Sequence, residues 1–303
     1  MAHDHDHGAA HAGTAGTAFA LGLGINLAFV VAELVFGVMS HSMALLADAG
    51  HNFGDVLGLG LAGSAAYMAT RKPSARRTYG YRRTTILASL ANALVLVLVT
   101  GGIVWESVLR LLHPSTVDEK IVVIVAVAGI FVNGGSALLF LRDRKSDLNV
   151  GSAFAHLAAD AALALGVAVA GIVVMYTRWL WLDPAVSIAL SIFILVSTFG
   201  LLRGSLDLAL DAVPAHVDPE VVRNYLSACP CVVSVHDLHI WAMSTTETAL
   251  TAHIVTESGS CEPKILREMC HHLEHEFGIG HSTIQAEPQG PADGCRQAPD
   301  DAV

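Results

Sequence analysis

The chain has 303 residues, of which 53% are hydrophobic and only 15% are charged, and its formal net charge is −10. Soluble proteins carry about 25% charged residues, so this composition indicates a membrane protein. The negative net charge argues against nucleic acid as a partner.

Six stretches of the chain are long and apolar enough to be membrane-spanning helices, which need about 20 residues. In chain order they cover residues 18–39, 43–69, 86–109, 121–141, 151–176 and 180–203. No basic segment precedes the first stretch, so we expect a retained cytoplasmic tail over 1–17 rather than a cleaved signal peptide. The tail interleaves Asp with His3, His5, His7 and His11, a composition that either binds metal weakly or simply stays solvated.

Lys and Arg residues are distributed unevenly between the connecting loops. One set of loops holds Arg71, Lys72, Arg76, Arg77, Arg82, Arg83, Arg142, Arg144, Lys145 and Arg203. The opposite set holds only Arg110, Lys120 and Arg178. Cytoplasmic loops carry the excess of positive charge, so both termini are predicted to be cytoplasmic. We expect a multi-pass protein of a bacterial inner membrane, with its transmembrane domain over 18–212.

Residues 213–288 have the pattern of a small soluble domain. A helix begins near Asp218 and Pro219, and two alternating strands, an amphipathic helix and a short strand follow. This αββαβ order is typical of a ferredoxin-like α+β domain. The predicted fold is therefore a membrane all-α six-helix bundle with a C-terminal cytoplasmic α+β domain, and residues 289–303 are expected to be a disordered tail.

The cysteines are all in this C-terminal part, at Cys229, Cys231, Cys261, Cys270 and Cys295. An odd number of cysteines in a reducing cytosol predicts free thiols or possible ligands rather than disulfides. Cys229 and Cys231 lack the C-x-x-C spacing of zinc sites, which predicts buried or incidental thiols.

Two polar pairs interrupt the second and fifth apolar stretches. His51 and Asp55 are four residues apart, as are His156 and Asp160, so each pair lies on one helix face. A charge at the bilayer centre costs about 2.5–3.5 kcal/mol, and almost no Lys or Arg is available there as a partner. Two imidazoles and two carboxylates suit tetrahedral zinc, whereas calcium and magnesium prefer oxygen ligands. These residues predict an intramembrane zinc site.

Other interpretations of these pairs stay open. Each pair could be structural, and Asp48 could support the site or lie outside it. The same ligands could serve an exporter of cobalt, nickel, iron or manganese, because affinity separates these metals poorly. A membrane metal sensor that does not transport would need only histidines in the cytoplasmic domain. No nucleophile and base arrangement indicates an enzyme.

Five motifs carry a resemblance to the cation diffusion facilitator family, close to its zinc-exporting branch. They read ALLADAGHNFGD, YGYRR, LNVGSAFAHLAAD, WLDPAVS and VHDLHIWAMS. The resemblance implies a homodimer that exports zinc in exchange for protons, with His51, Asp55, His156 and Asp160 as the ligands shared by helices two and five. Thr85 stands where the family often has an acidic residue.

The resemblance also implies a second zinc site in the cytoplasmic domain, where zinc would be a regulatory or structural ligand. Its residues are His236, His253 and Glu287, for which solvated surface histidines are the alternative. His239 is predicted to serve packing instead. Because metal ligands must be deprotonated, protons can compete with zinc for the intramembrane histidines. The sequence holds no ATP-binding phosphate loop, so the proton gradient is the expected energy source.

Overall fold

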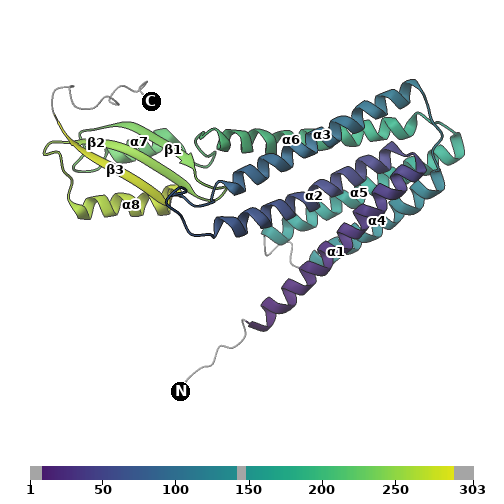
Figure 1. The fold of residues 1–303 in the computed structure, drawn as a ribbon, viewed down its shortest axis with the longest axis horizontal. Coiled ribbons are helices and arrows are strands. Elements are labelled where there is room, and N and C mark those ends of the chain that lie inside the picture. Colours follow the sequence, from purple (N-terminus) through teal and green to yellow (C-terminus); the bar gives the residue numbers. More distant parts are fainter. Residues whose placement is uncertain (1–8, 142–147, 290–303) are drawn as a thin grey trace, which may run out of the picture. The chain divides into compact units, whose positions relative to one another are not determined.

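The computed structural model describes residues 9–141 and 148–289 (Figure 1). Several predictions fall outside these residues: they concern His3, His5 and His7 of the N-terminal tail, the loop residues Arg142, Arg144 and Lys145, and the C-terminal tail from residue 290.

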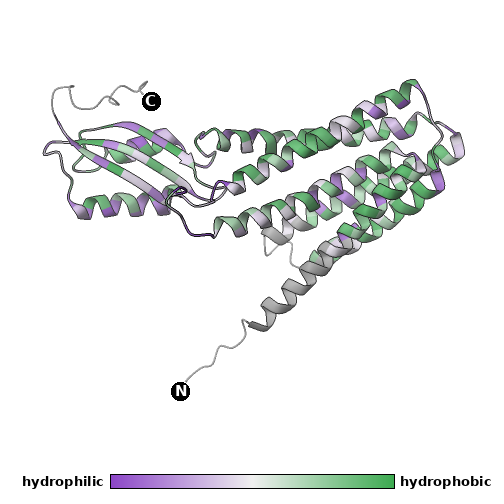
Figure 2. Ribbon diagram, viewed as in Figure 1, coloured by the Kyte–Doolittle hydropathy of each residue, from purple (hydrophilic) through white to green (hydrophobic). Residues whose placement is uncertain are grey.

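Each of the six apolar stretches coincides with a long helix. The helices are α1 (Ala9–Ser40), α2 (Met43–Ala69), α3 (Thr84–Leu112), α4 (Glu119–Phe140), α5 (Leu148–Thr177) and α6 (Leu182–Ala209). Among the described residues, four of them, α3 to α6, are apolar over the length of a membrane span. Figure 2 shows them as mainly hydrophobic ribbons. The six-span count stays a prediction for α1 and α2.

The chain forms two compact units. The first comprises residues 1–60 and 92–200, and within it α4 packs along α5 and also contacts α1. The hydrophobic contact between α4 and α5 includes Val122, Ala126, Val167 and Ala168, all buried. These small and β-branched side chains let the helices approach closely.

Asp183 of α6 fixes the start of α2 within this unit. Its buried carboxylate accepts hydrogen bonds from the Ser42 hydroxyl and from the backbone N–H groups of Met43 and Ala44, the last at 3.4 Å. The first N–H groups of a helix have no partner inside the helix, so an acceptor is needed here. An acid from a different helix therefore caps α2.

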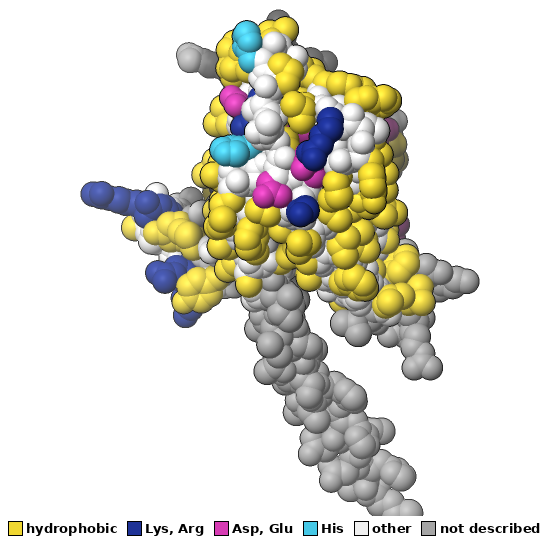
Figure 3. Space-filling model, turned by 90° about the vertical axis from the view of Figure 1, so that its right-hand side faces the viewer, with side chains coloured by type: hydrophobic (Ala, Val, Ile, Leu, Met, Phe, Trp, Pro, Cys, Tyr) yellow, Lys and Arg dark blue, Asp and Glu magenta, His cyan; other side chains and the backbone are white. Residues whose placement is uncertain are grey.

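At the end of the first unit where α5 turns into α6, Figure 3 shows a small number of charged side chains among many hydrophobic ones. In the α5–α6 turn, the Arg178 guanidinium donates a hydrogen bond to the Glu119 carboxylate at 2.9 Å. Trp179 and Trp181 stack at this turn with ring centroids 5.9 Å apart, as suits an aromatic belt at a membrane interface.

The second unit comprises residues 61–91 and 201–303 and contains the small domain. Its elements follow the predicted αββαβ order: α7 (Pro219–Ser227), β1 (Ser234–Ala242), β2 (Thr248–Thr256), α8 (Pro263–Phe277) and β3 (His281–Pro288). The sheet order is β1-β2-β3, with β1 antiparallel and β3 parallel to β2. Both helices pack against the sheet, over a core that includes Leu226, Leu250, Ile254 and Leu273.

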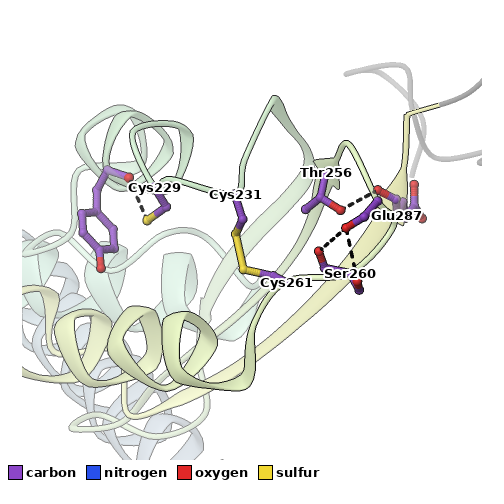
Figure 4. The surroundings of a disulfide bond; sticks show 8 residues. Cys229, Cys231, Thr256, Ser260, Cys261 and Glu287 are labelled. Atoms are coloured by element: carbon purple, nitrogen blue, oxygen red, sulfur yellow. Dashed lines mark hydrogen bonds between the residues drawn. A yellow bond between two sulfur atoms is a disulfide. The ribbon is translucent and has the colours of Figure 1, made fainter.

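The prediction that the cysteines are free is wrong for one pair. Cys231 and Cys261 form a disulfide with their Cα atoms 5.9 Å apart, joining the segments before β1 and before α8 (Figure 4). Cys229 and Cys270 are free. Cys229 donates to the Tyr225 carbonyl, and burial raises the pKa of its thiol. Cys229 is partly buried, and its raised pKa makes it a weakly reactive thiol at neutral pH, compatible with the predicted buried or incidental thiol.

Candidate metal sites

The predicted pairs of α2 and α5 converge on one point of the first unit. His51 Nε2 lies 3.4 Å from Asp160 Oδ1 and 3.9 Å from Asp55 Oδ2. His156 Nε2 lies 3.3 Å from Asp55 Oδ2 and 3.7 Å from Asp160 Oδ2. In tetrahedral zinc sites with bonds of about 2.0–2.2 Å, neighbouring ligand atoms lie about 3.3–3.6 Å apart. The ligand atoms of His51, Asp55 and Asp160 all lie within 4.8 Å of one another, close enough to share a metal ion. His156 contacts both carboxylates but is not part of this close group of three.

The burial of these side chains is uneven. Asp160 is 5% exposed and His51 14%, whereas Asp55 is 27% and His156 50% exposed. Asp160 Oδ1 is buried without a hydrogen bond to any described residue. A buried carboxylate oxygen without a donor is unfavourable, and a bound cation would satisfy it. The site is thus closed around Asp160 and open at His156.

Two further acids lie inside the first unit. Glu33 of α1 is fully buried and accepts a hydrogen bond from Asn52 Nδ2 at 2.8 Å, and Asp48 of α2 is 3% exposed. Asn52 follows the proposed ligand His51 directly, so this side-chain hydrogen bond links α1 to α2 next to the proposed site. An acidic residue within an apolar stretch, as Glu33 is, indicates a buried polar contact. The sequence alone did not identify Asn52 as its partner.

Small residues of α2 admit α3 next to Asp55. A Cβ atom added at Gly54 would lie 2.1 Å from Leu96 Cδ2, and one at Gly58 would lie 2.8 Å from Asn92 Nδ2. Both distances are shorter than atoms tolerate, so a larger residue at either position would force the Leu96 or Asn92 side chain of α3 to move.

In the small domain, the three predicted residues meet on one face of the sheet. His236 and His253 are direct partners in the β1–β2 pairing, and Glu287 lies on β3. Glu287 Oε2 lies 3.4 Å from His236 Nε2, and Glu287 Oε1 lies 3.2 Å from His253 Nδ1. His236 Nε2 is buried with no hydrogen bond to the described part of the chain. A buried imidazole nitrogen that lies near a carboxylate oxygen, and makes no hydrogen bond, is suited to share a metal ion with that carboxylate.

Sequence reasoning missed Asp237 at this site. The β1–β2 register shifts between His236 and His239, and Asp237 adopts a φ of +50° there. Its buried carboxylate lies 3.5 Å from His253 Nε2 and 2.8 Å from His239 Nε2. His239 is an exposed partner of this acid, so the prediction that it serves packing is wrong. The bulge is the reason, since it breaks the strand alternation on which that prediction rested.

Thr85, which replaces the family acid, contacts backbone groups of the second unit. Its hydroxyl donates to the Arg82 carbonyl at 3.0 Å and accepts from the Thr245 N–H at 3.1 Å. It holds the start of α3 against the β1–β2 turn.

Comparisons with known proteins cover most of the chain. A family model described as the cation efflux transmembrane domain matches residues 20–208, and one described as the cation efflux protein cytoplasmic domain matches 214–289. The metal cation efflux system protein CzcD of Cupriavidus metallidurans is 36% identical over 94% of this chain and 89% of its own. The zinc transporter ZitB of Escherichia coli is 34% identical over 95% and 93%.

A third relative is the cadmium, cobalt and zinc/H(+)-K(+) antiporter of Bacillus subtilis, 31% identical over 86% of this chain and 85% of its own. These relatives are bacterial, in agreement with the predicted inner-membrane location. The transmembrane match covers more than half of the chain and its apolar helices are long enough to span a bilayer. The chain is therefore a multi-pass membrane protein of the cation diffusion facilitator family, a cation efflux transporter and not an enzyme.

Proposed function

We propose that this protein exports zinc from the cytoplasm in exchange for protons, through a site formed by His51, Asp55, His156 and Asp160. The single observation that carries the proposal is that each of the two imidazoles contacts both carboxylates, at nitrogen–oxygen distances of 3.3–3.9 Å. Borderline-soft zinc prefers such a mixed nitrogen and oxygen set, whereas calcium and magnesium prefer six or more oxygens.

Proton exchange follows from the chemistry of these ligands. Histidine binds metal only in its neutral form, so zinc and protons compete for His51 and His156. A site that faces the cytoplasm and the outside in turn would release zinc where protons are abundant. The half-exposed His156 beside the buried Asp160 gives protons and metal access to one side of the ligand set. The Bacillus relative, named as an H(+)-K(+) antiporter, supports ion exchange.

Other divalent cations are the second candidate cargo. The name of the Bacillus relative includes cadmium and cobalt as well as zinc. Two neutral histidines at one site favour zinc over manganese and iron, but cobalt accepts the same ligands. We propose zinc first because the ZitB relative is named for zinc alone.

We further propose that His236, His253 and Glu287 hold a second zinc ion in the cytoplasmic domain, and that the protein is a homodimer. The orphaned His236 nitrogen supports the site, and the match to the cytoplasmic domain of cation efflux proteins supports assembly there. Zinc would cross-link β1 and β3, and Asp237 would orient the His253 ring through its second nitrogen.

The test is zinc uptake into inside-out vesicles under an imposed proton gradient. Wild type should take up zinc only with the gradient, and Asp160→Asn should reduce the uptake to background. Glu106→Gln is the matched control, because it removes a partly exposed α3 carboxylate that pairs with Arg110. Uptake by Asp160→Asn at the wild-type rate would remove Asp160 from the site. Gradient-independent uptake would contradict proton exchange, and folded wild type without uptake would indicate a sensor.

A further inference from the structure

We propose that the loop between α2 and α3 binds a phosphate group, and that its natural ligand is the headgroup of an anionic phospholipid in the cytoplasmic leaflet. The proposal concerns a cavity of the second unit that neither metal site uses. It does not depend on which cation is transported.

The cavity has a volume of about 380 Å³, and its lining is basic and aromatic. Among the lining side chains are Arg76, Arg77, Arg82, Arg83, Tyr79 and Trp241. The four arginines and Tyr79 come from the α2–α3 loop, and Trp241 comes from the end of β1. The volume is within the range of small-ligand pockets, about 300–1,000 Å³.

The loop is a fixed structure. Ser74 and Arg77 exchange two backbone hydrogen bonds of 3.0 Å, and the Gly80 N–H donates to the Arg77 carbonyl at 2.9 Å. Gly80 has a φ of +68°, which other residues adopt only with strain. Arg82 pairs with Glu247 of the β1–β2 turn and thereby ties the loop to the domain. The cavity wall is therefore preorganised.

Positive charge in this loop exceeds its partners. Residues 70–83 contain six cations and no acid: Arg71, Lys72, Arg76, Arg77, Arg82 and Arg83. Arg82 pairs with Glu247 and Arg83 with Asp211, which leaves four of the six unneutralised. Arg77 donates to the Tyr81 hydroxyl at 3.0 Å, a neutral partner, and Arg76 has no ion pair within the described chain. Two guanidinium groups at the cavity thus remain available to an anion.

The chemistry of the lining selects phosphate. Guanidinium forks bind phosphate oxygens in pairs, and they repel the metal cations that this protein transports. The loop directly follows α2, a predicted membrane span, and directly precedes α3, which is apolar over the length of a span, so we expect it at the cytoplasmic membrane surface. Anionic lipid headgroups are concentrated at that surface, and basic pockets next to membrane helices recognise them. A lipid phosphate is therefore favoured over free phosphate.

Trp241 provides a direct readout. The chain has four tryptophans, Trp105, Trp179, Trp181 and Trp241. With the first three changed to Phe, the full-length protein in detergent reports on the cavity through Trp241 fluorescence. We would titrate it with short-chain phosphatidylglycerol, short-chain phosphatidylcholine and inorganic phosphate. We expect phosphatidylglycerol to shift the emission, phosphatidylcholine to have no effect, and R76Q/R77Q to weaken phosphatidylglycerol binding at least tenfold.

The matched control is K264Q/R267Q, which removes two charges from the exposed face of α8 and should leave phosphatidylglycerol binding unchanged. Unchanged binding in R76Q/R77Q, or no response to any phosphate compound, would overturn the proposal. Inorganic phosphate binding as tightly as phosphatidylglycerol would overturn the lipid assignment. Native mass spectrometry of the chain with all four tryptophans provides a second test, because retained phosphatidylglycerol should be lost in R76Q/R77Q alone.

Discussion

At the scale of single residues, a carboxylate beside an imidazole does more than balance its charge. Asp237 contacts the far nitrogen of His253, whose other nitrogen faces Glu287. This arrangement fixes the ring orientation and the tautomer of a metal-binding histidine. Asp237 is therefore a positioning residue for the proposed cytoplasmic site.

We expect Asp237→Asn to weaken zinc binding at the cytoplasmic domain by about 10–100-fold, the usual effect of losing such a partner. The measurement is calorimetric titration of the full chain in an Asp160→Asn background, so that zinc binding at the transport site does not contribute. Glu257→Gln, at an exposed position after β2, should bind zinc like the parent. Equal affinity in Asp237→Asn and the parent would show that the acid does not support the site.

The sequence contains a recognisable pattern for the predicted ligands but none for Asp237. His51 and Asp55 were predictable because helix periodicity places residues four apart on one face. His236 and His253 were named from the family resemblance, and their strands were predictable from alternation. Asp237 required the register shift next to it, which depends on how two strands pair and leaves no local pattern.

At the scale of elements, the α2 start depends on a capping group that is distant in sequence. The Asp183 carboxylate receives three donors from the segment Ser42 to Ala44. The WLDPAVS motif is therefore a structural link between α6 and α2, the helix that carries His51 and Asp55. Helix positions were predictable from hydropathy alone, but this link needed the three-dimensional packing.

We expect Asp183→Ala to destabilise the transmembrane domain by about 3 kcal/mol, because buried donors lose their acceptor. Asp183→Asn keeps one acceptor oxygen and should lose less. Thermal unfolding of the detergent-solubilised protein, followed by circular dichroism, measures both. An unchanged melting temperature in Asp183→Ala would show that water or another group replaces the cap.

At the scale of the whole molecule, zinc transport is expected to depend on the proton concentration at each side of the membrane. The proposed ligand set contains two histidines that must lose any bound proton before they bind zinc. The same four residues would therefore bind zinc more tightly when they face a neutral cytoplasm than when they face an acidic exterior.

We expect zinc affinity at the transport site to fall as the pH falls from 7.5 to 5.5, through the range in which histidines protonate. At the acid end, the logarithm of the affinity should change by up to two per pH unit, one for each histidine. Calorimetry on a His253→Ala background isolates this site from the cytoplasmic one. An affinity independent of pH would contradict competition between zinc and protons.

The Cys231–Cys261 bond makes the backbone between these residues a closed covalent ring. The ring contains the whole of β1 and β2, and with them His236, Asp237 and His253, whereas Glu287 lies outside it. A protease that cuts once between the two cysteines would leave the chain as a single molecule on a non-reducing gel. The same sample would separate into two fragments after reduction. The cytoplasmic histidines thus stay tethered to each other even when the polypeptide between them is broken.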